Sequence, residues 1–115
     1  MLNLFQHLFM ERMPKNNLFV MKTGYVYILS NYERTTLYIG VTSNLNNRIA
    51  QHKSGNGCKF TSKYKTHYLM HYECFNDMND AIRREKQLKR WHKEWKWNLI
   101  KTNNPSLIDL MGEED

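Results

Sequence analysis

The sequence of 115 residues has only two cysteines and contains no long hydrophobic run. Cys58 and Cys74 form no CxxC pair, which excludes a zinc knuckle. A domain of this length builds one core without disulfides, so two separate cysteines indicate free thiols in a reducing cytoplasm. No stretch is long enough to span a membrane, and the first 20 residues lack the basic start and cleavage site of a signal peptide. We therefore expect a cytoplasmic protein without membrane contact.

Acidic residues are scarce relative to basic ones, with 11 Asp and Glu against 17 Lys and Arg. The positive excess is concentrated in residues 83–96, which contain seven Lys and Arg but only two Glu. A clustered positive field favours a polyanionic partner, with nucleic acid first and an anionic membrane second. Charge alone is equally consistent with a solvated helix face, so this alternative stays open.

The order of predicted elements is β-β-α-β-α-α, which is typical of an α/β (α+β) fold. Runs of β-branched and aromatic residues predict strands at about 24–30, 36–40 and 67–75. The first two strands, joined by the turn formers NYERTT, should make a hairpin. Capping residues and helical periodicity predict helices at about 44–54, 78–91 and 93–102. The stretch SGNGCKFTSKYK is predicted to be a Gly- and Lys-bearing loop.

The chain is predicted to contain one folded domain at 22–110. Residues 1–21 are treated as an N-terminal appendage, because Met21-Lys22-Thr23 leads directly into the first confident strand. Residues 111–115, with the sequence MGEED, are predicted to be a frayed acidic tail.

Two predicted helices carry charged or polar residues on their apolar faces. In the first, Arg48 and His52 share the i, i+3, i+4, i+7 stripe of Leu45 and Ile49. In the long helix, Glu85 falls inside the apolar arc. A buried charge is costly unless it is paired or binds a metal, so Arg48 and Glu85 are either each other's salt bridge or parts of a site.

Tyrosines on the predicted hairpin favour a site. Alternation puts Tyr25 and Tyr27 on one face of the first strand. Tyr38 lies on the next strand, close to Gly40, which lets another group approach the backbone. Together with a helix Arg, His and Glu, these residues provide the proton acceptor, phosphate clamp and metal ligand that a phosphodiester hydrolase needs.

These residues also form a known pattern. The first motif is Tyr25-Val26-Tyr27, with Tyr in place of the usual Gly, and the second is Tyr38-Ile39-Gly40. Arg48, Glu85, Phe60-Thr61 and the closing Asn104-Pro105…Asp109-Leu110 follow in order. Over roughly residues 24–110 the chain resembles the GIY-YIG nuclease superfamily, and specifically its small stand-alone bacterial members.

The resemblance implies a small three-stranded antiparallel sheet flanked by helices, with a nuclease site. Glu85 would hold one divalent cation, Mg²⁺ with Mn²⁺ as a substitute. Arg48 would grip the scissile phosphate, and Tyr27 or Tyr38 would help deprotonate the attacking water, without a ranking between them. His52 matches a position of functional histidines in some members, against the alternative of a hydrogen-bonded imidazole at a helix end.

The expected function is cleavage of DNA by a metal-dependent endonuclease in DNA repair or recombination, in a bacterial cytoplasm where the protein joins the nucleoid when bound to DNA. No obligate protein partner is evident, and RNA as a substrate stays open. Another alternative is a nucleic-acid-binding module with little or no catalysis. The residues expected to bind nucleic acid are all basic: Lys59, Lys63, Lys65, Arg83, Arg84, Lys86, Lys89 and Arg90.

Three tryptophans near the basic stretch invite a second interpretation. Trp91, Trp95 and Trp97 suit base stacking on a nucleic acid, but their helical spacing favours packing residues. Asn98 is the nearest candidate for the Asn that many relatives carry after the glutamate helix, and its role stays open.

Overall fold

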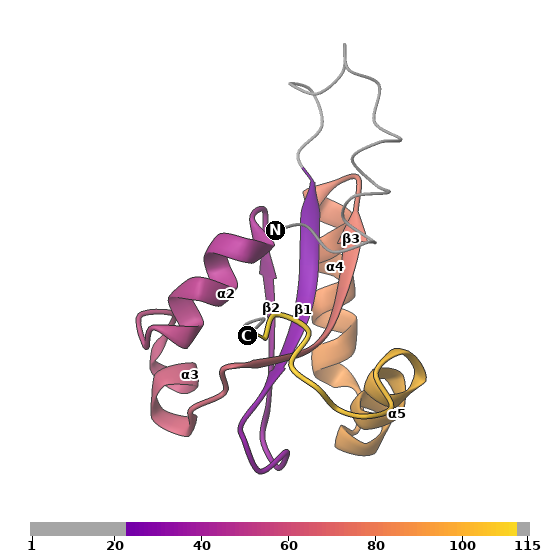
Figure 1. Cartoon of the computed structure of the whole chain (residues 1–115). Helices are drawn as coiled ribbons and strands as arrows, with labels where there is room; N and C mark the ends of the chain where they lie inside the picture. Colours follow the sequence, from indigo (N-terminus) through magenta and orange to yellow (C-terminus); the bar gives the residue numbers. More distant parts are fainter. Residues whose placement is uncertain (1–22, 113–115) are drawn as a thin grey trace.

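The computed structural model describes residues 23–112, so the predicted appendage and the end of the acidic tail lie outside the described residues. Three strands form one antiparallel sheet in the order β2-β1-β3. They are β1 (Gly24–Ser30), β2 (Leu37–Thr42) and β3 (Tyr68–Phe75). The helices of the described part are α2 (Leu45–Lys53), α3 (Lys59–Tyr64), α4 (Met78–Arg90) and α5 (Lys93–Asn103). The predicted α+β fold with a three-stranded antiparallel sheet is confirmed (Figure 1).

The predicted loop before β3 is wrong in its second half, because Lys59–Tyr64 form the short helix α3. Gly55, at φ 86°, and the residues after it make the turn that separates α3 from α2. The helix ends at Lys65, whose backbone is left-handed at φ 54°. One and a half turns carry too short an apolar pattern for recognition. The helix matters because its Thr61 is completely buried.

The central strand β1 divides the core into two layers. All seven of its residues are buried, because β2 and β3 flank it and helices cover both faces. One face packs on α4 and α5 through Val26, Ile28, Ala81, Leu88 and Ile100. The other face packs on α2 through Tyr25, Tyr27, Leu29, Leu45 and Ile49. Figure 1 shows α2 and α3 on one side of the sheet and α4 and α5 on the other.

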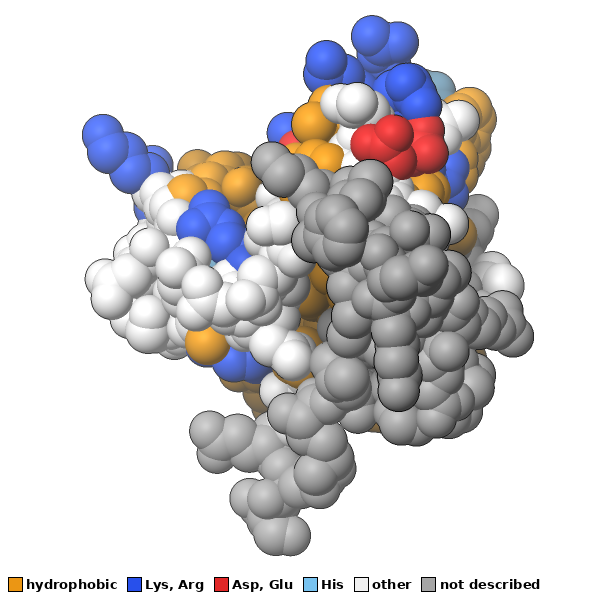
Figure 2. Space-filling model, turned by 90° about the horizontal axis from the view of Figure 1, so that it is seen from above, with side chains coloured by type: hydrophobic (Ala, Val, Ile, Leu, Met, Phe, Trp, Pro, Cys, Tyr) orange, Lys and Arg blue, Asp and Glu red, His pale blue; other side chains and the backbone are white. Residues whose placement is uncertain are grey.

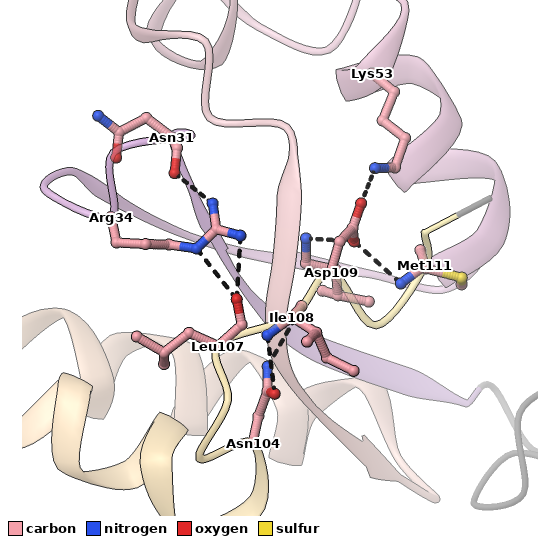
Figure 3. Close-up of polar contacts among 9 residues, drawn as sticks. Asn31, Arg34, Lys53, Asn104, Leu107, Ile108, Asp109 and Met111 are labelled. Carbon is pink, nitrogen blue, oxygen red and sulfur yellow. Dashed lines mark hydrogen bonds and ion pairs between the residues drawn. The ribbon is translucent and has the colours of Figure 1, made fainter. Parts of the chain in front are cut away.

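Polar contacts fasten the segment after α5 across β3 to the hairpin and α2 (Figure 3). The guanidinium of Arg34 donates to the carbonyl oxygen of Leu107 from Nε at 3.2 Å and from Nη2 at 3.1 Å. Asp109 accepts from the backbone N–H of Leu69 at 2.9 Å and forms an ion pair with Lys53. The closing segment thus connects elements on both sides of the sheet.

No helix between residues 23 and 112 is long and apolar enough to cross a lipid bilayer.

Asn104 is the buried anchor of this closing segment. It is 4% exposed, and its Nδ2 donates to the carbonyl oxygens of Met70 at 3.1 Å and Ile108 at 2.8 Å. Its Oδ1 accepts from the N–H of Ile108 at 3.1 Å.

We expect Asn104→Ala to lower the free energy of unfolding by about 2–3 kcal/mol, because it leaves buried backbone groups without partners. Urea unfolding followed by circular dichroism measures this change. The exposed Asn98 gives the matched control, and Asn98→Ala should stay within about 0.5 kcal/mol of the wild type. Equal stability of the two variants would contradict the anchoring role.

Candidate active site

The ring of Tyr27 lies across the backbone of Gly40. The two residues pair on neighbouring strands, and a Cβ built at Gly40 would lie 2.3 Å from the Tyr27 hydroxyl oxygen. Any side chain at this position would therefore displace the tyrosine. The prediction that Gly40 lets another group approach the backbone is confirmed, and the group is the tyrosine of the first motif.

The hydroxyl of Tyr27 begins a buried chain of hydrogen bonds. It lies 2.8 Å from Nε2 of His52, and Nδ1 of His52 lies 2.9 Å from Oγ1 of Thr61. Oγ1 of Thr61 donates its one proton to the backbone carbonyl oxygen of Cys58 at 3.3 Å, because a carbonyl can only accept. Thr61 must then accept from Nδ1–H, and Tyr27 must donate to Nε2. We therefore assign the neutral Nδ1–H tautomer to His52.

The surroundings of His52 keep its imidazole neutral. Burial, with the neighbouring Arg48 and His67, lowers the pKa of His52 to about 4. The ring is 0% exposed, and Gly57 packs so closely on it that an added Cβ would lie 2.1 Å from Nδ1. His52 faces inward as predicted, and it is a hydrogen-bonded imidazole at a helix end whose partner is one of the two motif tyrosines.

Arg48 lies half-buried on the same helix and acts on Tyr27. Burial raises the pKa of Tyr27, and hydrogen bonding and charge from Arg48 oppose this effect. The same contact with Tyr27 raises the pKa of Arg48. Nη1 of Arg48 donates to Oε1 of Gln51 at 2.8 Å, which steadies the guanidinium one turn before His52.

The ring of Tyr38 lies beside the hydrogen-bonded cluster of Tyr27, His52 and Thr61. Its ring centroid lies 5.5 Å from that of His52 and 5.6 Å from that of Phe60 on α3. Burial and the neighbouring Cys58 thiol raise the pKa of Tyr38 to about 12. Burial tends to raise the pKa of Cys58 itself, but hydrogen bonding with Thr61 and Tyr38 outweighs it and leaves that pKa lowered.

Sequence reasoning missed the parts that the α2–α3 region supplies. Thr61 entered only as part of a family pattern, and Cys58 only as a free thiol. Gly57 gave no signal beyond that of a loop glycine. A helix prediction at 59–64 would have placed Thr61 toward the core and drawn attention to it.

Glu85 lies on α4, which packs on the sheet face opposite α2. Its side chain is 15% exposed and forms an ion pair with Lys89 at 3.3 Å. The negative charge of Glu85 also raises the pKa of Tyr27, although burial and Arg48 have larger effects. Arg48 and Glu85 form no ion pair in the described part of the chain, so the alternative of a mutual salt bridge is wrong.

The donor set near Glu85 fits a magnesium ion better than a zinc ion. Residues 23–112 contain no group of three or more His, Cys, Asp or Glu side chains that would hold a metal by themselves. A zinc site needs such a set. Mg²⁺ commonly binds through one or two carboxylates, with water and substrate phosphate completing its shell. A single, largely buried carboxylate such as that of Glu85 fits that pattern.

The predicted nucleic-acid-binding residues divide by how they are engaged. Lys59, Lys63 and Lys65 are exposed on and after α3, and Arg83, Lys86, Lys89 and Arg90 are exposed on α4. Arg84 is different, because its guanidinium pairs with Glu73, at 2.8 Å from Nε and 3.1 Å from Nη2. Seen from above, Lys and Arg side chains stand in separate groups at the margin of the molecule, one of them beside carboxylates (Figure 2).

Comparison with known proteins agrees with this geometry. Residues 23–98 match the family model described as the GIY-YIG catalytic domain. The chain belongs to the GIY-YIG family. This confirms the resemblance drawn from the motifs, and membership in a nuclease family implies a nucleic-acid substrate for the GIY-YIG domain.

Relatives of this GIY-YIG chain include small proteins of similar length. A UPF0213 protein of Pediococcus pentosaceus is 36% identical over 87 residues, which cover 76% of this chain and 92% of the relative. A UPF0213 protein of Syntrophus aciditrophicus is 37% identical over 84 residues, covering 72% and 95%. A solution NMR structure of a UPF0213 protein from Bacillus halodurans matches with a TM-score of 0.47 and 29% identity, covering 71% of this chain and 86% of that chain.

We expect NMR spectra of the ¹⁵N-labelled protein to report the Nδ1–H tautomer of His52 at pH 7 and no protonation of this ring until the pH approaches 4. The exposed His92 provides a reference ring in the same spectra. Because the unfolded histidine binds its proton near pH 6.5, the unfolded state binds more protons between pH 6.5 and 4. This group's contribution to stability is therefore present above pH 6.5 and is lost as the pH falls toward 4. A His52 midpoint near 6.5 in the folded protein would contradict the assignment.

Proposed function

We propose that this chain is a divalent-metal-dependent endonuclease that hydrolyses phosphodiester bonds in DNA without a covalent enzyme intermediate. What supports it most is the buried hydrogen bond between the hydroxyl of Tyr27 and Nε2 of His52, with Arg48 one turn before His52 on the same helix. In the proposal, Arg48 is the phosphate clamp, Glu85 on α4 is the metal ligand and Tyr27 is the proton acceptor. A pathway in DNA repair or recombination is part of the same proposal.

Arg48 would hold the scissile phosphate. A guanidinium stays charged at any physiological pH, and its forked N–H groups bind two phosphate oxygens at once. The side chain is half-buried, with Nη1 on Gln51, so its position is set before substrate binds. Its charge stabilises the additional negative charge that develops on the pentavalent phosphorus.

Tyr27 would accept the proton of the attacking water. As its oxygen takes that proton, its own hydroxyl proton passes along the 2.8 Å bond to Nε2 of His52. His52 then carries both ring protons, and Nδ1–H keeps its bond to Thr61 throughout. The raised pKa of Tyr27 permits this exchange, since the hydroxyl is never required to remain ionised. Tyr38 is the competing candidate, without a bond to the imidazole.

Glu85 would bind one Mg²⁺, with Mn²⁺ as a substitute. When bound there, the cation supplies Lewis-acid stabilisation of the leaving oxygen. Glu85 would then no longer pair with Lys89, whose exposed ammonium group would be free to bind substrate phosphates. The products are one phosphate end and one hydroxyl end.

Cleavage should depend on both Arg48 and Glu85. With labelled duplex and branched DNA in Mg²⁺, we expect Arg48→Ala to lower the rate by about 10²–10³-fold. Glu85→Gln should abolish the metal-dependent rate, and EDTA should do the same to the wild type. Lys101→Ala and Glu94→Gln remove comparable charges from exposed positions of α5 and serve as matched controls.

Several results would contradict the proposal. If the wild type binds DNA but never cuts it, and folded Arg48 and Glu85 variants bind equally well, the chain is a binding module. Cleavage of labelled RNA in preference to DNA identifies an RNA-directed nuclease. Thermal melting of each variant distinguishes these outcomes from a loss of folding.

The two tyrosines can be separated by removing one hydroxyl at a time. We expect Tyr27→Phe to lower kcat by at least about 10²-fold, the usual contribution of a positioned acid or base. Tyr38→Phe should cost less than about 10-fold, because this hydroxyl lies outside the chain to His52. Steady-state cleavage at saturating DNA measures both. The opposite ranking would assign the proton transfer to Tyr38.

A further inference from the structure

A hollow lies on the side of the sheet covered by α4 and α5, where these two helices meet. Its volume is about 580 Å³, within the range of roughly 300–1,000 Å³ seen for ligand sites. None of the described residues that line it is a carboxylate. The lining consists of cationic, amide and indole side chains: Arg83, Lys86, Gln87, Arg90, Trp91 and Trp95.

Trp95 gives this groove an aromatic surface. Its side chain is 49% exposed, so the prediction that all three tryptophans are packing residues is wrong for Trp95. Trp91 and Trp97 do pack against the core. Trp91 meets Trp95 nearly edge-on, at 6.3 Å between ring centroids and 79° between planes, and His92 supports it at 4.8 Å and 84°. Neighbouring rings thus hold the indole in place without covering it.

Trp91, which packs against Trp95, is itself held in place. The guanidinium of Arg84 lies 5.2 Å from the centroid of the Trp91 ring, and its bidentate pair with Glu73 holds it there. Burial would raise the pKa of Glu73, but hydrogen bonds from His71 and Arg84 hold it at about 2, so this carboxylate stays ionised. A platform built in this way loses little conformational entropy when a ligand stacks on it.

The cations of the groove are available to a ligand. Lys86 and Arg90 form no ion pair with any described residue, and Arg83 pairs only with the exposed Asp80. Lys93 and Lys96 follow on α5, where burial and the charge of Lys93 lower the pKa of Lys96, as expected in a positive field. The chemistry of the groove therefore suits a ligand that carries both anionic groups and flat apolar rings.

The groove is separate from the candidate active site. Lys86, Arg90 and Arg83 lie roughly 100° to 160° around the axis of α4 from Glu85, at 100° per residue. Glu85 faces the sheet and Tyr27, whereas these cations face outward. A nucleic acid in the groove would therefore not present its scissile phosphate to Arg48, and the groove would hold a flank of the substrate.

Unpaired nucleic acid fits these features better than duplex or membrane. In a duplex the base faces are stacked on one another and leave nothing for an exposed indole, whereas single strands offer a free base face to every aromatic ring. An anionic lipid surface matches the charge, but membrane-surface segments present a continuous apolar face. Here the hollow has one indole face among cations.

We propose that this groove binds a single-stranded extension of the substrate, with a base stacked on Trp95 and phosphates held by Lys86 and Arg90. The inference rests on the proposed function only in taking nucleic acid as the substrate. It predicts that the chain prefers DNA with an unpaired strand, such as a flap or an overhang, over a blunt duplex.

Binding in EDTA tests the groove apart from cleavage. Fluorescence anisotropy would compare a blunt duplex with the same duplex carrying an oligo(dT) extension. For the wild type we expect the extension to tighten binding by roughly 10-fold to 100-fold, the effect of stacking one base. Trp95→Ala should remove this gain, and Trp95→Phe should keep most of it. Removing Lys86 or Arg90 should reduce the slope of log K against log salt by about 0.7 each. Lys101→Ala is the charge-matched control.

Two outcomes would overturn the inference: an extension that gives no gain in the wild type, or an equal gain in folded Trp95→Ala. Anionic phosphatidylserine vesicles serve as the rival ligand. Trp95-dependent binding to vesicles without any gain from the extension assigns the groove to a membrane surface instead. Cleavage is read separately in Mg²⁺. If no DNA is cut but the extension still binds through Trp95, the endonuclease proposal fails and the groove stands.

Discussion

The hydrogen bond between the Tyr27 hydroxyl and His52 is the contact on which the arrangement of the first half of the chain depends. β1 is buried along its whole length, so a hydroxyl on this strand needs an internal partner, and leaving it unpaired would cost about 1–3 kcal/mol. His52 supplies the partner from α2, and Thr61 from α3 completes the imidazole's bonds. Gly40 and Gly57 make room for the two rings, since a Cβ on either would collide with them.

The same hydrogen bond also determines the charge of the Tyr27–His52 pair in the candidate site. A buried phenol and a buried imidazole both prefer to be neutral, so the resting pair brings no charge into the core. Arg48 and Glu85 bring opposite charges toward this pair from helices on opposite sides of the sheet. The sheet keeps these two charges apart, so they do not neutralise each other, and the proposed mechanism assigns Arg48 to a phosphate and Glu85 to a cation.

Other charged side chains form ion pairs that stabilise the fold. Lys53 pairs with Asp109 to fasten the closing segment, and Arg84 pairs with Glu73 beneath Trp91. Among the described residues, cations without such partners are exposed on α3, along the outer face of α4 and on α5. Some cationic side chains thus form ion pairs within the fold, and only those that face solvent are available to a polyanion.

Periodicity in the sequence determined the strands, the three longer helices and the inward direction of His52 and Glu85, because side-chain spacing along a chain decides which face each residue occupies. The sequence also indicated that another group lies close to the backbone of Gly40. Only the tertiary structure decided what those faces meet. The short helix α3 has too few residues to show a period, so the bond from His52 to Thr61 was invisible. The sheet lies between the helices of Arg48 and Glu85 and prevents the ion pair that the sequence allowed, and Trp95 shares its neighbours' spacing but not their burial. Contacts between layers depend on distances across the core, and no local pattern in the chain encodes them.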